Sequence, residues 1–242
     1  MFFSLEAIAK YQREMDALDP AGQPTARVLH RGTKEPGRRV GILDASFNPM
    51  TLAHEALLTV ARQTYHLDEM LLMLSRSNVD KELSGAGLGA RLAMLMLYAQ
   101  EKENVSVGIC SHARFVDKIA ALKQIYPDGT GFFFLVGYDT LLRLFDEKYY
   151  VDMETELRAL FETCHFIAAD RDANAPETLR LFLQKKEILA SGAAIHPIEL
   201  PGALASISST QIRNEIQKNA SIENLVPQSI SRAIRRLGLY VR

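Results

Sequence analysis

Two short segments, far apart in the chain, each combine hydroxyl groups, a basic side chain and the start of a predicted helix. The first runs from Gly41 to His54 and reads Gly-Ile-Leu-Asp-Ala-Ser-Phe-Asn-Pro-Met-Thr-Leu-Ala-His, and the second runs from Ser206 to Arg213 and reads Ser-Ile-Ser-Ser-Thr-Gln-Ile-Arg. Backbone N–H groups at a helix start bind phosphate oxygens, and hydroxyls and an arginine add further donors. Two such segments on one domain predict a polyphosphate held from both sides, for which a nucleotide is the natural candidate.

In the first segment, Thr51 is a predicted helix N-cap, and His54 lies one turn further on the same face. We expect the phosphates to meet the backbone N–H groups of Ala45, Ser46 and Phe47, together with the Thr51 hydroxyl and the His54 ring. A histidine N–H that donates to the α-phosphate stabilises a pentacoordinate transition state, because negative charge builds on the non-bridging oxygens there. The plain alternative is that Thr51 only caps the helix and His54 is an ordinary polar residue.

In the second segment, Ser208, Ser209 and Thr210 open the other predicted helix. Arg213 lies one turn beyond Thr210 and can bind the outer phosphates through two N–H groups. The leaving group of a nucleotidyl transfer is pyrophosphate, and its developing charge needs a partner of this kind. The alternative is a serine-rich N-cap followed by a solvated arginine.

Four further residues are candidates at other points of the same predicted site. Gly137 and Asp139 follow the apolar run 132–136, and an acid at the carboxyl end of a strand often binds ribose hydroxyls. Asp139 could instead cap the next helix. Lys81 and Arg91 offer positive charges to the phosphates, with a solvated surface position as the alternative for each.

Tyr149 and Tyr150 are the candidates for stacking on a flat aromatic ligand. A tyrosine ring offers a large apolar face for stacking and a hydroxyl that reaches a polar partner. Partly buried packing against the protein's own core is the alternative for this pair.

From Arg39 onward, short apolar runs alternate with longer segments of helical periodicity. Continuous apolar strands between helices indicate an α/β fold with a doubly wound, mostly parallel sheet. Ligands of such sheets lie outside the carboxyl ends of the strands, and the candidate segments fall there. The predicted strands are Val40–Leu43, Met70–Leu74, Val105–Ile109, Gly131–Val136, His165–Ala168 and Ala194–Ile198, and the predicted helices are Leu52–Tyr65, Gly89–Lys102, Phe115–Ile125 and Pro176–Leu189.

The N-terminal part has a different composition. Residues 2–17 carry apolar side chains at a helical period, and residues 19–38 are rich in proline, glycine and arginine, which predicts a linker or surface loop. We therefore divide the chain into an N-terminal helix and linker, residues 1–38, and a single compact domain, residues 39–242. Covering the sheet or tethering a partner are both open roles for the first part.

Composition limits the partners and the compartment. The formal net charge of -1 gives no global field that would attract nucleic acid or a membrane surface. Cys110 and Cys164 are the only cysteines and each lies in an apolar run, so we expect a reducing compartment, cytoplasm or nucleus, and no disulfide framework or metal cluster. Arg114, Asp117 and Lys118 form a charged helical face for which we expect solvation or an ion pair. Whether the protein is a homo-oligomer stays open.

The two segments resemble the two signatures of a known family. Ser46-Phe-Asn-Pro-x-Thr-x-x-His54 and Ile207-Ser-Ser-Thr-x-Ile-Arg213 are similar to those of the nicotinamide/nicotinate mononucleotide adenylyltransferases, in the nucleotidyltransferase superfamily with the His/Thr-x-Gly-His motif. The resemblance spans residues 39–242, including the tail from Ser221 to Tyr240. It implies a Rossmann-like fold, ATP with Mg²⁺, and attack by the 5′-phosphate of a pyridine mononucleotide on the α-phosphorus of ATP, giving NAD and pyrophosphate. By position it implies ATP contacts for Ala45, Ser46, Phe47, His54, Gly137, Asp139, Thr210, Gln211, Ile212 and Arg213.

This chain departs from the family pattern at three points. Ala45 and Ala53 stand where the family commonly has glycine, and the chain contains no tryptophan, although the family commonly stacks the pyridine ring on one. Tyr149 or Tyr150 falls near the position of that tryptophan. The combination looks most like a divergent fungal branch of the family.

Three hypotheses follow. The first is ATP-dependent adenylyl transfer to nicotinamide or nicotinate mononucleotide, with His54 and Arg213 as the catalytic residues. The second keeps the chemistry but changes the acceptor to another phosphate, or to water, and is motivated by Ala45 and the missing tryptophan. The third is a non-catalytic nucleotide-binding protein, against which the presence of both His54 and Arg213 argues.

Overall fold

The fold is built on one central sheet. The computed structural model describes residues 4–76, 85–169, 181–184, 188 and 194–241. Within them seven strands form a sheet in the order β1-β4-β3-β2-β5-β6-β7, in which only the β1–β4 pair is antiparallel. The strands are β1 (Ala26–His30), β2 (Arg39–Asp44), β3 (Glu69–Ser75), β4 (Val105–Cys110), β5 (Gly131–Gly137), β6 (His165–Ala169) and β7 (Ile195–Ile198).

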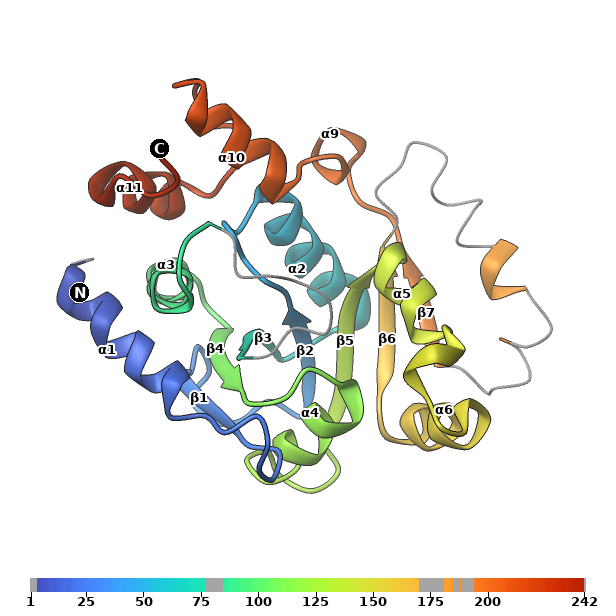
Figure 1. The fold of residues 1–242 in the computed structure, drawn as a ribbon. Coiled ribbons are helices and arrows are strands. Elements are labelled where there is room, and N and C mark those ends of the chain that lie inside the picture. The colour runs from blue at the N-terminus through green and yellow to red at the C-terminus, as the bar shows by residue number, and fades with distance from the viewer. Residues whose placement is uncertain (1–3, 77–84, 170–180, 185–187, 189–193, 242) are drawn as a thin grey trace.

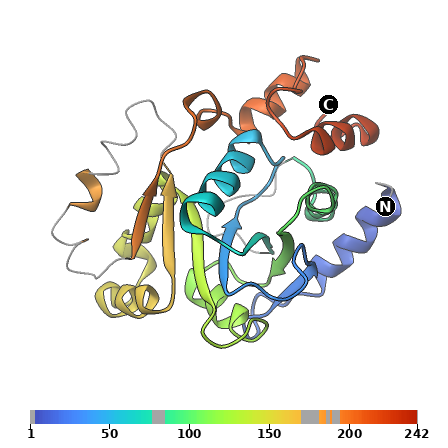
Figure 2. The same ribbon diagram turned by 180° about the vertical axis from the view of Figure 1, so that it is seen from behind.

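Helices cover both faces of this sheet (Figure 1). Along β2, Leu43 packs into one core and Val40 and Ile42 into the other, as the two-residue period of a strand requires. Figure 2 shows the same layers from behind. One layer contains α1 (Leu5–Asp16), α2 (Leu52–Tyr65), α3 (Leu88–Gln100), α9 (Gly202–Ala205), α10 (Ser209–Gln217) and α11 (Gln228–Leu237), and the other contains α4 (Phe115–Leu122), α5 (Tyr138–Leu144) and α6 (Met153–Thr163).

The predicted doubly wound, mostly parallel α/β fold is confirmed. Helix α2 has the bounds predicted for it, because Thr51 caps its start and His66 ends it in the left-handed conformation, with φ of 49°. The six predicted strands are all present, with ends that differ by at most one residue. The predicted helix Pro176–Leu189 lies largely outside the described residues.

The prediction of a loop for residues 19–38 is wrong for Ala26–His30, which form β1. This edge strand pairs with β4, Ala26 opposite Cys110 and His30 opposite Val107. Its five residues are too short a stretch to stand out among flanking prolines and glycines. Helix α1 packs on α3, where Gly89 permits the close approach: a Cβ at Gly89 would lie 2.6 Å from the carbonyl oxygen of Ile8. The division at residue 38 stays a prediction.

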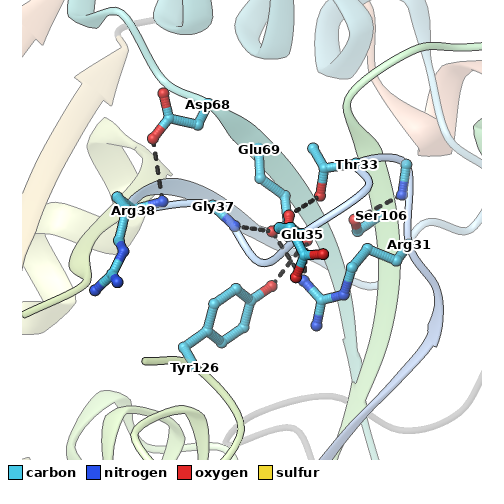
Figure 3. A network of polar contacts seen from close by, with 10 residues as sticks. Arg31, Thr33, Glu35, Gly37, Arg38, Asp68, Glu69, Ser106 and Tyr126 are labelled. Atoms are coloured by element: carbon cyan, nitrogen blue, oxygen red, sulfur yellow. Dashed lines mark hydrogen bonds and ion pairs between the residues drawn. The ribbon is translucent and has the colours of Figure 1, made fainter. Parts of the chain in front are cut away.

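A buried carboxylate holds the chain that follows β1 against the sheet (Figure 3). Glu69, the first residue of β3, is fully buried and accepts hydrogen bonds from Arg31 at 2.9 and 3.0 Å, from Gly37 N–H at 2.8 Å and from the Tyr126 hydroxyl at 2.9 Å. Burial, followed by the charge of Glu69, raises the pKa of Tyr126. Because Glu69 lies opposite Val40, near the start of β2, the network occupies the amino edge of the sheet.

Cys110 and Cys164 are both free and buried, and burial raises the pKa of each thiol, that of Cys164 to about 12. Among the helices that the structure describes, none has the length and apolar character needed to span a membrane.

Candidate active site

The two phosphate-type segments meet at the carboxyl edge of the sheet. The strand order reverses between β2 and β5, so the ligand crevice of this fold lies where these two neighbours end. There the Ser209 hydroxyl donates to the Pro49 carbonyl at 2.8 Å, and Arg213 Nη1 donates to the Asn48 carbonyl at 2.8 Å. Figures 1 and 2 show the starts of α2 and α10 side by side. Residues some 160 positions apart therefore form one site.

Thr51 orients the His54 ring. The Thr51 backbone N–H donates to Nδ1 of His54 at 3.0 Å, and the His54 backbone N–H donates to the Thr51 hydroxyl oxygen at 3.3 Å. Because Nδ1 accepts, the neutral ring carries its proton on Nε2. Thr51 is therefore the predicted cap of α2. Its side chain is 0% exposed, and a direct contact of its hydroxyl with phosphate stays a prediction.

The loop between β2 and α2 has an unusual backbone. Phe47 is in the left-handed region with φ of 42°, a conformation that costs about 1–3 kcal/mol in a residue with a side chain. The surroundings hold it: the Asn48 side chain accepts from Ala86 N–H at 3.3 Å, and Arg91 Nη1 donates to the Ser46 carbonyl at 3.3 Å. Ala45 lies outside the left-handed region, so its methyl group does not strain the backbone.

Arg91 is 3% exposed, which excludes the solvated alternative for this residue. Besides its bond to the Ser46 carbonyl, it donates through Nε to the Ala86 carbonyl at 2.7 Å. The arginine therefore supports the phosphate-type loop from the side of α3.

The hydroxyls of the second segment already have local partners. The Ser208 side chain accepts from Gln211 N–H at 3.1 Å and caps α10, and the Thr210 hydroxyl oxygen accepts from Arg213 Nη2 at 3.1 Å. Ile212 is fully buried in the core, and its N–H donates to the Ser208 carbonyl at 3.2 Å. The side chain of Ile212 thus anchors the helix, and its place near ATP stays a prediction.

Gly137 and Asp139 lie where β5 ends, beside β2. Gly137 is the N-cap of α5, without a side-chain capping bond, and Asp139 is exposed in the first turn. The alternative that Asp139 caps this helix is therefore wrong. A carboxylate in the first turn interacts favourably with the helix dipole and stays available to a ligand hydroxyl.

The two tyrosines differ in their surroundings. The Tyr150 hydroxyl donates to the Leu144 carbonyl at 2.6 Å, its ring packs against the α6-side core, and burial raises its pKa to about 12. Tyr149 ends a 3-10 helix, η1 (Glu147–Tyr149), with the Lys148 ammonium 4.7 Å from its ring centroid. Tyr150 thus packs against the protein's own core, which was the alternative to ligand stacking for this pair. Contact of either ring with a ligand stays a prediction. Lys81 lies outside the described residues.

An ion pair between Lys118 and Asp44 lies at the same edge of the sheet, and the sequence did not predict it as part of the site. Lys118, 2% exposed, places Nζ 2.5 Å from Asp44 Oδ2 and also donates to the Ala113 carbonyl. The Ser75 hydroxyl donates to Asp44 Oδ1 at 2.9 Å. Asp44 directly precedes the phosphate-type loop, so Lys118 neutralises a carboxylate that would otherwise repel phosphate. The available signal was an acid at the end of β2 and a lysine in the helix that follows β4, two strands away in the sheet.

The pattern of residues across this site matches a defined family. A profile described as cytidylyltransferase-like matches residues 42–215, which include both segments. The chain belongs to the cytidylyltransferase-like family. The match begins after β1 and ends within α10, so α1, β1 and α11 lie outside it.

Two relatives, aligned over most of their own length, indicate the branch of this family to which the chain belongs. A Synechococcus protein named as a nicotinate-nucleotide adenylyltransferase is 31% identical over 217 residues, covering 84% of this chain and 95% of the relative. A Schizosaccharomyces pombe protein named as a nicotinamide mononucleotide adenylyltransferase is 30% identical over 223 residues, covering 82% and 85%. Within the family, the chain therefore belongs with the pyridine mononucleotide adenylyltransferases, which are nucleotidyltransferase enzymes.

A solved structure confirms the Rossmann-like fold. Nicotinic acid mononucleotide adenylyltransferase of Plasmodium falciparum, solved in complex with NaAD, superposes with a TM-score of 0.62 at 20% identity, covering 84% of this chain and 97% of that one. The complex of the same enzyme with APC gives 0.60 at 18% identity. At this identity the likeness establishes the fold.

Proposed function

We propose that this protein transfers the adenylyl group of ATP to the 5′-phosphate of nicotinamide or nicotinate mononucleotide. The observation that carries the proposal is the contact between the two phosphate-type segments, Arg213 with Asn48 and Ser209 with Pro49. One polyphosphate placed there meets donors from two helix starts at once. The names of the relatives support the pyridine mononucleotide as the acceptor.

The reaction is an in-line displacement at the α-phosphorus of ATP. An oxygen of the acceptor's 5′-phosphate forms the new P–O bond, the bond from the α-phosphorus to the α–β bridging oxygen breaks, and pyrophosphate leaves with the electron pair. His54 Nε2–H donates to a non-bridging α-phosphate oxygen, whose negative charge increases in the transition state. The hydrogen bond from Thr51 holds the ring proton on that nitrogen before ATP binds.

Arg213 serves the leaving group. Without a ligand its guanidinium donates to the Asn48 carbonyl and the Thr210 hydroxyl oxygen. An arginine can bind two phosphate oxygens at once, so Arg213 exchanges these neutral acceptors for the β- and γ-phosphates. The N–H groups of Ser46 and Phe47 complete the phosphate contacts, whereas the Ala45 N–H donates to the Met73 carbonyl at 3.4 Å, and Asp139 binds the adenosine ribose.

Mg²⁺ enters this proposal as the companion of ATP, where it screens the negative charge of the phosphates. The described residues contain no group of three or more His, Cys, Asp or Glu side chains that could hold a metal ion. Asp44 is paired with Lys118, and Asp139 is an exposed carboxylate at the same edge. Mg²⁺ on a nucleotide needs only one or two carboxylates beside phosphate and water, and of these two residues Asp139 would fit an ion that ATP carries, because both Asp44 oxygens are already bonded to Lys118 and Ser75.

The test is a coupled assay. The purified protein is incubated with ATP, Mg²⁺ and nicotinamide mononucleotide, and NAD is followed with a dehydrogenase; nicotinate mononucleotide is run in parallel with chromatographic detection. We expect NAD formation, reduced about 10²–10³-fold in His54→Ala. His30→Ala, in the edge strand β1, is the matched control and keeps full activity.

Two results would replace this proposal. Pyrophosphate release with other phosphates, and none with pyridine mononucleotides, would support a different acceptor. ATP binding without any pyrophosphate release would support a non-catalytic role.

A further inference from the structure

Gln12, in α1, caps the start of a different helix, α3. The N-cap residue of α3 is Gly87, which has no side chain to accept a hydrogen bond. The Gln12 Oε1 atom accepts from the Gly89 backbone N–H at 2.9 Å, and Gly89 is the second residue of that helix. A capping side chain accepts from the second or third N–H of a helix, and it usually belongs to the N-cap residue itself. Here a neighbouring helix supplies the acceptor.

The backbones of the two helices come close together at this contact. A Cβ at Gly89 would lie 2.6 Å from the Ile8 carbonyl oxygen and 2.8 Å from the Gln12 backbone nitrogen, so the approach requires glycine. A backbone N–H can only donate, so the oxygen of the Gln12 amide must face Gly89. The amide nitrogen, Nε2, donates to Asp16 Oδ1 at 3.0 Å and completes the orientation of the side chain.

The start of α3 is also bonded to the phosphate-type loop between β2 and α2. Asn48 Oδ1 accepts from the Ala86 N–H at 3.3 Å. Arg91 donates through Nε to the Ala86 carbonyl at 2.7 Å and through Nη1 to the Ser46 carbonyl at 3.3 Å. Gly85 has φ of 83°, and a Cβ there would lie 2.7 Å from Asn48 Oδ1. The start of α3 therefore contacts α1 on one side and the phosphate-type loop on the other.

Arg91 fixes the direction of an N–H group that is proposed to bind phosphate. The Ser46 carbonyl and the Phe47 N–H belong to one planar trans peptide group, in which the two bonds point in opposite directions. A hydrogen bond that holds the carbonyl toward Arg91 therefore directs the Phe47 N–H away from Arg91. Because Phe47 has the unfavourable φ of 42°, this orientation persists only while its surroundings hold it.

We propose that Gln12 is a positioning residue for the nucleotide site, which acts through the start of α3 on the Phe47 N–H. The inference rests on the proposed function for the identity of the ligand, ATP. Without its cap the start of α3 opens more often, and only the closed fraction of the molecules binds ATP with full affinity. Gln12 lies outside residues 42–215, which match the family profile, so the N-terminal segment 1–38 gains a part in the site.

The test is Gln12→Met, which removes the acceptor and keeps an unbranched side chain of similar length. ATP binding is measured by calorimetry without an acceptor, and the backbone amide NMR signals of Gly89 and Phe47 are compared with those of the wild type. We expect the Kd for ATP to rise roughly three- to tenfold, as the loss of a helix cap predicts, and both signals to shift. An unchanged Kd, or a shift at Gly89 alone, would overturn the inference.

Gln12→Glu is the rescue variant. A carboxylate keeps an acceptor for the Gly89 N–H, and a negative charge is favourable at a helix start. We expect the Kd for ATP to stay within about twofold of the wild-type value. A rise as large as that in Gln12→Met would contradict the role assigned to the Oε1 atom.

Two controls separate positioning from general stability. Asp16→Ala removes the exposed partner of Gln12 Nε2 and leaves Oε1 in place, so the Kd for ATP should not change. Tyr98→Phe removes a 3.1 Å hydrogen bond to Glu55 Oε1 near the other end of α3, so Tm should fall while the Kd stays the same. A Kd that rises in step with the fall of Tm in every variant would exclude a positioning role.

The outcomes also separate this inference from the proposed function. A protein whose ATP affinity depends on Gln12, but which makes no pyridine dinucleotide, would overturn only the proposed acceptor. A protein that makes the dinucleotide, with the same Kd for ATP in the wild type and in Gln12→Met, would overturn only the inference. A wild type that does not bind ATP would overturn both.

Discussion

The backbone N–H of Thr51 and the Nδ1 atom of His54 are joined by a 3.0 Å hydrogen bond, so the cap of α2 also determines which ring nitrogen carries the proton. Capping boxes usually employ a glutamate or glutamine at the position that His54 occupies. A histidine there makes one ring nitrogen part of the helix cap. The second ring nitrogen, Nε2, is then the donor.

This relationship predicts an order among replacements of His54. Glutamine keeps an amide N–H at about the reach of Nε2, whereas asparagine and alanine do not. We expect His54→Gln to retain at least tenfold more turnover than His54→Asn or His54→Ala, at saturating ATP. Steady-state kinetics with pyrophosphate detection measures this, and circular dichroism checks the fold. Equal rates in all three variants would exclude a donor role for Nε2.

The Asp44–Lys118 pair predicts strong coupling. Asp44→Asn leaves a nearly fully buried ammonium without its counter-charge, and should cost about 3 kcal/mol of unfolding free energy. Lys118→Met should cost less, because Asp44 keeps Ser75 and some solvent contact. The double variant should recover part of the loss, with a coupling energy of about 1–3 kcal/mol in urea unfolding. Additive losses would mean that the two groups do not stabilise one another.

Glu69 predicts a loss of stability without a loss of nucleotide affinity. Glu69→Gln removes the charge that faces Arg31 in a fully buried position, and should cost about 3 kcal/mol of unfolding free energy. The KM for ATP should not change, because the network lies at the amino edge, opposite the candidate site. Glu103→Gln, at an exposed position, is the charge-matched control. A large KM change in Glu69→Gln with normal stability would contradict this assignment.

Two histidines predict how stability depends on pH. His165 Nδ1 lies 3.2 Å from His196 Nε2, and burial is the main cause that lowers the pKa of each ring. In the unfolded chain these rings titrate near pH 6.5. As pH falls, the two rings are protonated in the unfolded chain before they are protonated in the folded protein. The free energy of unfolding is therefore highest above pH 6.5 and decreases as pH falls from there through the lower pKa values of the folded state.

The measurement is the unfolding free energy in denaturant between pH 7.5 and pH 5. We expect it to decrease as pH falls in the wild type and to decrease less steeply in His165→Gln or His196→Gln. The same slope in both variants and in the wild type would assign the pH dependence to other groups.

Local signals explain which parts of the fold were predictable. Helix α2 was delimited because Thr51 is a cap and the Asn48-Pro49 turn precedes it. The meeting of the two segments could be predicted from a parallel sheet, since the carboxyl ends of parallel strands share one edge.

Long-range contacts explain what sequence reasoning missed. Strand β1 exists through its pairing with β4, and its own five residues carry no clear period. The burial of Lys118 depends on Asp44, which lies 74 positions earlier. For Ser209 and Arg213 the sequence predicts phosphate binding, or a helix cap and a solvated side chain, yet both bond to carbonyls of the other segment. Such partners are set by tertiary packing.

Helix α3 contacts the first and the last helix of the chain. Helix α1 and helix α11 both pack on it, and Figure 1 places the two termini on the same side of the molecule. A fusion partner at either end would therefore sit over the same helix. Removal of α1 or of α11 would expose apolar surface of α3, the helix on which both pack. We therefore expect a truncation at one terminus to make the protein less tolerant of a truncation at the other, although the two termini are farthest apart in sequence.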